Sequence, residues 1–193
     1  MIGKLTNTIV TAVLTVMLAS VSYAQDEPDR AGYFDVRSAS AGLNNGVHEL
    51  EARLQLVLSA DALHALNSGV PLRIELNLEV IRMRRFMPDA GAAQLTLQYE
   101  LEYRPLSQRY LVSNLNSGDQ DSFATLYSAL NNLGRIQGLP IIDDSLLNPD
   151  ADYRIRVRAL LSTRQYPAPL RILFFWRSEW QLKSEWYEWR LER

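Results

Sequence analysis

Apolar and polar side chains alternate with a period of two over several long stretches of this chain. A strand that buries one face and exposes the other to water has this period, so we expect long strands over residues 49–58, 72–83 and 94–103. The alternating apolar positions are Leu50, Ala52, Leu54, Leu56 and Leu58, then Leu72, Ile74, Leu76, Leu78 and Val80, then Leu95, Leu97, Tyr99, Leu101 and Tyr103. After Val80 the apolar positions move by one residue, to Ile81 and Met83, which predicts a β-bulge near Val80.

The remaining pattern predicts shorter strands and two helices. Strands are expected over residues 35–41, 109–115 and 153–161, with one or two more over 170–189, broken near Ser178. Ser59 can cap a helix that ends at Asn67, and Asp121 or Ser122 can cap a second one that ends before Gly134. Turn-forming residues at 44–46 and 88–91 suit hairpins. We therefore predict an all-β, mainly antiparallel β-sandwich of about six to eight strands with two short connecting helices.

The first 24 residues have the organisation of a secretory signal peptide. Lys4 supplies the positive charge, residues 9–19 are apolar, and Ser22-Tyr23-Ala24 provides small residues where cleavage requires them. A retained anchor is the alternative, but the apolar run is short for a bilayer. We expect residues 1–24 to be removed, 25–31 to be a disordered lead-in, and 32–193 to form one sandwich domain in the periplasm, with no membrane span after cleavage.

The composition excludes several classes of function. The formal net charge is −2, whereas nucleic-acid binding needs a basic surface. Cysteine is absent, which excludes disulfides, thiol catalysis and thiolate metal sites. The two histidines, His48 and His64, are not in a zinc-site spacing, and no Gly-x-Ser-x-Gly motif occurs. We interpret His48 and His64 as ordinary surface or partly buried histidines. We predict no catalytic residues and no cofactor.

One acidic loop could in principle hold calcium. It carries Asp143, Asp144, Asn148, Asp150 and Asp152, and calcium prefers such oxygen ligands. Tyr153 and Ala159, however, stand where a calcium loop needs glycine and glutamate. A solvated turn is the favoured interpretation, so we predict no metal site.

Arginines form a ladder at alternate positions 154, 156 and 158, and a second group at 82, 84 and 85. Such ladders can bind an anionic partner or a membrane surface. Pairing with glutamates of a neighbouring strand is the simpler interpretation, since the overall charge is balanced.

All four tryptophans lie in the last 18 residues, at 176, 180, 186 and 189. Along a strand Trp186 falls on one face while Tyr187 and Trp189 fall on the other, so at most one of these faces can pack on the core. An exposed ring beside Arg190 has the composition of a binding hot spot. We therefore predict Trp186, Tyr187, Trp189 and Arg190 as binding residues, and the alternative is a closing strand whose rings fill the sandwich.

Several segments resemble an uncharacterised family of exported proteobacterial proteins, domain-of-unknown-function family 4390. They are 62–72, Ile81-Arg82-Met83-Arg84-Arg85, Leu139-Pro140-Ile141-Ile142-Asp143, Glu179-Trp180 and Glu185-Trp186-Tyr187-Glu188-Trp189. The resemblance implies a signal peptide and one exported domain, with no established activity or catalytic residues. It also implies a gene neighbour encoding a sensor histidine kinase of the nitrogen-regulation type, which is an association and not a mechanism.

We thus expect a non-enzymatic periplasmic interaction module whose partner is a protein at the periplasmic side of the inner membrane, with a sensor kinase as the leading candidate. The alternative is a carrier that holds a lipid or another apolar ligand inside the sandwich. An enzyme that uses carboxylates alone is a further alternative.

Overall fold

The computed structural model describes residues 31–163, 166–167 and 180–192, and these residues form nine strands, two α-helices and one 3₁₀ turn. In chain order the elements are β1 (Tyr33–Asn44), β2 (Val47–Val57), α2 (Ala60–Asn67), β3 (Leu72–Arg82), β4 (Ala90–Arg104), β5 (Arg109–Asn114), β6 (Gln120–Phe123), α3 (Leu126–Leu133), β7 (Arg135–Asp143), η1 (Asp144–Leu146), β8 (Tyr153–Ser162) and β9 (Tyr187–Arg190).

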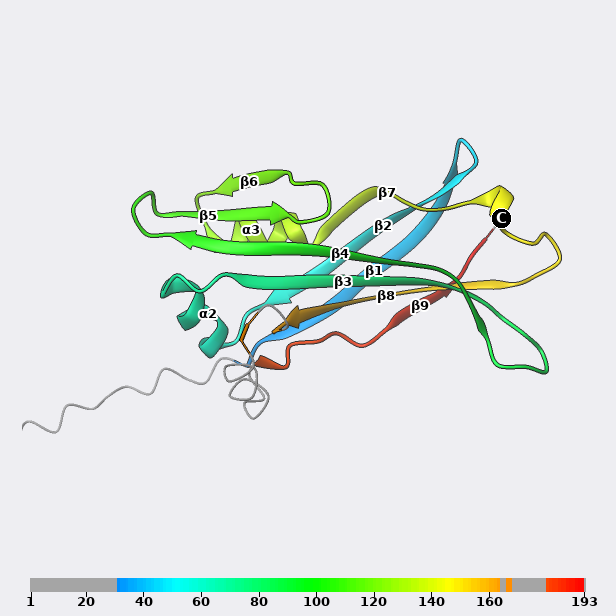
Figure 1. Ribbon diagram of the computed structural model, residues 1–193, viewed down its shortest axis with the longest axis horizontal. Coiled ribbons are helices and arrows are strands. Elements are labelled where there is room, and N and C mark those ends of the chain that lie inside the picture. The colour runs from blue at the N-terminus through cyan, green and yellow to red at the C-terminus, as the bar shows by residue number, and fades with distance from the viewer. Residues whose placement is uncertain (1–30, 164–165, 168–179, 193) are drawn as a thin grey trace, which may run out of the picture.

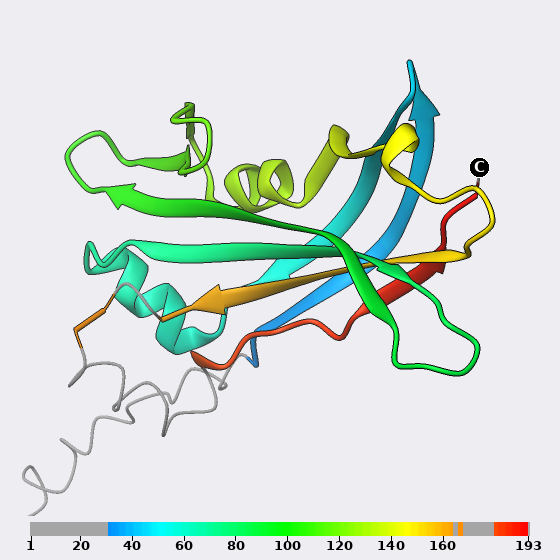
Figure 2. The same ribbon diagram turned by 45° about the vertical axis from the view of Figure 1, so that its right-hand side comes forward.

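The strands form two sheets that enclose one core. The smaller sheet has the order β1-β2-β7 and the larger has the order β6-β5-β4-β3-β8-β9. All of the strand pairs are antiparallel. Figures 1 and 2 show the smaller sheet crossing behind the long strands of the larger one, with α3 beside β5 and α2 at one end. The predicted all-β, mainly antiparallel sandwich with two short helices is confirmed.

The alternating apolar residues of neighbouring long strands lie opposite one another, so they share one face of the sheet. Leu76 of β3 lies between Leu97 of β4 and Ala159 of β8. The core residues expected from the alternation are confirmed: Leu54, Leu56, Leu76, Leu97 and Val157 are buried in one cluster, and the half-buried Tyr99 packs against it. The β3–β4 register shifts between Val80 and Ile81, which confirms the bulge.

The second helix begins later than predicted. Residues 120–123 pair with β5 as strand β6, so neither Asp121 nor Ser122 can cap a helix. Thr125 is the N-cap instead, and its hydroxyl oxygen accepts a hydrogen bond from the Ser128 N–H at 3.1 Å. The first helix is as predicted, with the Ser59 hydroxyl accepting from Ala62 N–H at 3.3 Å.

Some predictions concern residues that the structure does not describe. The signal peptide, most of the lead-in and the segment 168–179, with Trp176 and the predicted break at Ser178, lie outside the described residues. Of the strands expected over 170–189, only β9 falls within them. Among the helices that are described, none combines the length and the apolar character needed to cross a bilayer.

Candidate functional site

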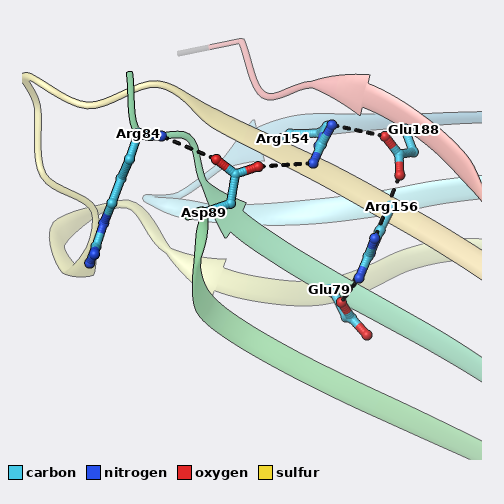
Figure 3. Close-up of polar contacts among 6 residues, drawn as sticks. All are labelled: Glu79, Arg84, Asp89, Arg154, Arg156 and Glu188. Atoms are coloured by element: carbon cyan, nitrogen blue, oxygen red, sulfur yellow. Dashed lines mark hydrogen bonds and ion pairs between the residues drawn. The ribbon is translucent and has the colours of Figure 1, made fainter. Parts of the chain in front are cut away.

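The outer face of the larger sheet carries a chain of alternating charges. Arg156 of β8 contacts Glu79 of β3 at 2.7 Å and Glu188 of β9 at 3.7 Å. Glu188 also contacts Arg154 at 3.1 Å, and Figure 3 shows how these side chains follow one another across three strands. The expected pairing of the ladder with neighbouring glutamates is confirmed for Arg154 and Arg156. A linked network holds side chains in place better than isolated surface pairs do.

Trp186 lies on this same outer face, directly before β9. The guanidinium carbons of Arg156 and Arg158 lie 4.4 and 4.2 Å from the centroid of its ring. These distances are typical of cation–π contacts. Arg158 has no ion pair with any described carboxylate, and its Nε is buried without a hydrogen bond, so the indole ring is its main partner. Trp186 is half-buried, and both guanidinium groups lie over its ring.

The four predicted binding residues are adjacent in the chain but point to two sides of the sheet. Tyr187 and Trp189 pair with Val157 and Ile155 in register and pack against the core, with ring centroids 6.0 Å apart. Arg190 is exposed and forms an ion pair with Asp152. The expected separation of Trp186 from the other two rings is therefore present. Tyr187 and Trp189 close the sandwich, as the alternative interpretation proposed.

The charge network reaches the β3–β4 hairpin through one residue. The Asp89 carboxylate contacts Arg154 at 3.1 Å and accepts a hydrogen bond from the Arg84 backbone N–H at 3.2 Å (Figure 3). Asp89 thus ties both sides of the hairpin loop to the outer face of the sheet. The loop beyond this tie is held at its base while its tip remains in solvent.

The tip of the hairpin exposes two large apolar side chains. The relative accessibility is 93% for Phe86 and 58% for Met87. The guanidinium groups of Arg84 and Arg85, on the N-terminal side, have no ion pair within the described residues and are exposed. We refer to Arg84, Arg85, Phe86 and Met87 as the tip motif. The arginines could be identified from the sequence as a basic group, whereas Phe86 and Met87 could be found only from two adjacent apolar residues next to a turn-rich segment.

Other exposed apolar residues belong to segments at the same end of the molecule. Leu43 next to the β1–β2 turn and Leu146 in η1 are exposed, and Figure 1 shows both of these segments at the end that carries the β3–β4 hairpin. The β4–β5 turn, with the fully exposed Leu106, lies at the opposite end. This turn provides a matched control position for the tip motif.

His48 and two residues of the acidic loop are engaged in structural contacts. His48 was expected at the surface or partly buried, which is wrong: as an inward-facing residue of β2 it is fully buried, and its Nε2 lies 2.9 Å from Asp144 Oδ1. His64 is exposed on α2. Hydrogen bonds from the Ser145 hydroxyl, which has the larger effect, and from the Ser145 backbone N–H lower the pKa of Asp143 below its ordinary value. Within the described part of the chain, no three acidic or histidine side chains gather as a metal site.

Comparison with known proteins identifies a matching family. The model of domain-of-unknown-function family 4390 matches residues 31–190, which is nearly the whole described chain. No curated protein and no solved structure matches.

Proposed function

We propose that this chain, which belongs to domain-of-unknown-function family 4390, is a non-enzymatic periplasmic module that binds a membrane protein through the tip motif. The observation that carries the proposal is the exposure of Phe86 and Met87 beside two arginines without ion pairs. Aromatic residues, methionine and arginine are the types enriched in the cores of protein interfaces. A solvent-exposed phenylalanine gains free energy when a partner covers it.

The charge network supports the proposal because it organises the hairpin before binding. Asp89 joins the Arg84 backbone to Arg154, and Arg154 continues to Glu188. An already ordered loop loses little conformational entropy on binding, so more of the contact energy appears as affinity. The network thus has a role in function without contact to the partner.

The charge of the tip motif indicates the chemistry of the partner. Two unpaired guanidinium groups beside an apolar pair require an apolar pocket with an acidic rim, because opposite charges increase the rate of association and fix the orientation. A periplasmic domain of an inner-membrane protein is the partner that we propose, and a sensor histidine kinase is the class that the family resemblance favours.

A comparison of variants tests the proposal. Wild-type protein, Phe86→Ala/Met87→Ala and Leu106→Ala are each crosslinked in membranes, recovered, and analysed by mass spectrometry with quantification. We expect one inner-membrane protein to be enriched with the wild type and with Leu106→Ala. With Phe86→Ala/Met87→Ala we expect the recovery of this protein to fall, because loss of the two side chains should weaken the binding free energy by about 2 kcal/mol or more, roughly 30-fold in affinity.

Equal recovery with all three proteins would contradict the role of the tip motif. Recovery of free monomer alone would contradict the interaction module itself. If the wild type binds protein-free anionic vesicles and the double variant does not, the tip motif binds a lipid surface and the proposed protein partner is wrong. Circular dichroism of each variant checks that the fold is retained.

A further inference from the structure

The pairing of β2 with β7 begins with two arginines directly opposite each other. Arg53 and Arg135 are partners in the antiparallel register, so their side chains leave the same face of the sheet, with Cβ atoms about 5 Å apart. Like charges in this position destabilise a strand pair. Both residues are exposed, and neither forms an ion pair or a side-chain hydrogen bond within the part of the chain that the structure describes. Their juxtaposition contrasts with the outer face of the larger sheet, where Arg154 and Arg156 each contact two carboxylates.

A cavity of about 290 Å³ opens beside this pair, between β1, β2, α3 and the start of β7. Its wall contains a third arginine and several neutral polar groups but no carboxylate: with Arg53 and Arg135 it includes Arg37, Gln55, Asn131 and Tyr127. The charge of Arg37 is offset by Asp35 at 2.9 Å, and its Nε donates to the Gln55 side chain at 2.8 Å. No carboxylate lines the cavity, so the charges of Arg53 and Arg135 have no opposite charge within its wall.

We propose that this cavity binds a phosphate-type oxyanion between Arg53 and Arg135. Each guanidinium presents a planar fork of N–H donors that matches two oxygens of a phosphate group. The two facing guanidinium groups carry two positive charges, which balance the two negative charges of a dianion. The side-chain amides of Gln55 and Asn131 add N–H donors for the remaining oxygens. The group can belong to a free phosphorylated molecule or to a phosphomonoester lipid headgroup, because both present the same oxygens. This site is separate from the tip motif and does not rest on the proposed function.

A structural role for the two arginines is the other explanation. It predicts the opposite change in stability when either arginine is replaced. Gly134 ends α3 immediately before Arg135, and the carbonyl end of a helix attracts cations. If the arginines stabilise this helix end, removal of either charge should destabilise the protein. If they form an anion site, removal of either charge should relieve repulsion in the absence of the anion.

Thermal unfolding of the full chain, in chloride and in inorganic phosphate at equal ionic strength, separates the two explanations. We expect phosphate to raise the midpoint of the wild type in proportion to the logarithm of its concentration above the dissociation constant. In chloride, Arg135→Gln and Arg53→Gln should unfold at the same temperature as the wild type or higher. In phosphate both variants should lose the shift, and calorimetric titration should show binding weakened at least tenfold.

Arg104→Gln is the matched control, because it removes the same charge at an exposed position at the end of β4, where Arg104 pairs with Glu102. It should keep the phosphate shift. Sedimentation with vesicles that contain phosphatidic acid identifies the source: binding that depends on Arg135 indicates a lipid headgroup, and binding of soluble phosphate alone indicates a free phosphorylated molecule. The absence of a phosphate-specific shift in the wild type, an equal loss in Arg104→Gln, or destabilisation by Arg135→Gln in chloride would overturn the proposal.

Discussion

Replacement of Trp186 by alanine should reduce the stability of the fold. The ring has guanidinium groups at 4.4 and 4.2 Å, and each such contact contributes about 0.5–1 kcal/mol at a partly exposed site. The ring is also half-buried, so roughly 100 Å² of apolar surface returns to water at about 25 cal/mol per Å². Because the unfolded chain already buries part of this area, we expect the free energy of unfolding to fall by about 2–4 kcal/mol.

Urea unfolding at 25 °C measures this loss, and a double-mutant cycle isolates the cation–π part of it. Trp186→Ala is combined with Arg158→Gln, because Arg158 has no described ion pair that would contribute to the coupling. The coupling energy should be about 0.5–1 kcal/mol. The same cycle with Arg156 would also report its contacts with Glu79 and Glu188.

Two results would refute this reasoning. A loss below about 0.5 kcal/mol would show that Trp186 is a free surface ring. In that case it would remain available as the binding residue that the sequence predicts. A coupling energy of zero would show that Arg158 gains nothing from the indole ring.

Leu97→Asp should cost several kcal/mol or abolish folding, because it places an unpaired charge in the core; a melting curve equal to that of the wild type would contradict the strand register. Gly134→Ala should cost about 1–3 kcal/mol although its φ of −78° suits alanine, since the new Cβ would lie 2.4 Å from a β2 carbonyl oxygen. Gly42→Ala, with no atom within 4 Å of its Cβ, is the control that should leave the stability nearly unchanged. The carboxyl of Asp143 should titrate below its ordinary 3.8 by NMR, and Ser145→Ala should move the pKa upward. Because this pKa is lowered in the fold, the stability contribution is present above about pH 4 and disappears as the pH falls through the folded value.

The long strands could be predicted from the sequence because each buries one face only. Every second residue of β3 from Leu72 to Val80 is buried between β4 and β8, and this produces the period of two directly. The displaced phase after Val80 located the bulge for the same reason.

Strand β7 could not be predicted in this way because its pairing is irregular. Its register with β2 shifts twice, Gly138 has a φ of +60°, and Pro140 interrupts the donor pattern. These features remove the alternation that identifies a strand. Strand β6 was missed because it has only four residues and its exposed side chains read as a helix start.

The candidate site was predictable only in part. Alternation correctly separated Trp186 from Tyr187 and Trp189, but it could not show which face pointed outward. That choice depends on the pairing of β9 with β8, which connects residues 30 to 36 positions apart. The pairing of Arg53 with Arg135 also depends on the tertiary structure, because the two residues are far apart in the sequence and no local pattern indicates that they pair.

The central claim is that the tip motif contacts a membrane protein, and site-specific photocrosslinking in cells tests it most directly. A photoreactive amino acid replaces Phe86 in one variant and Leu106 in the other, and both are irradiated in cells that carry the intact membrane. We expect position 86 to yield one discrete crosslinked inner-membrane protein, identified by mass spectrometry, and position 106 not to yield it. No crosslink at position 86, or the same crosslinked protein from both positions, would contradict it.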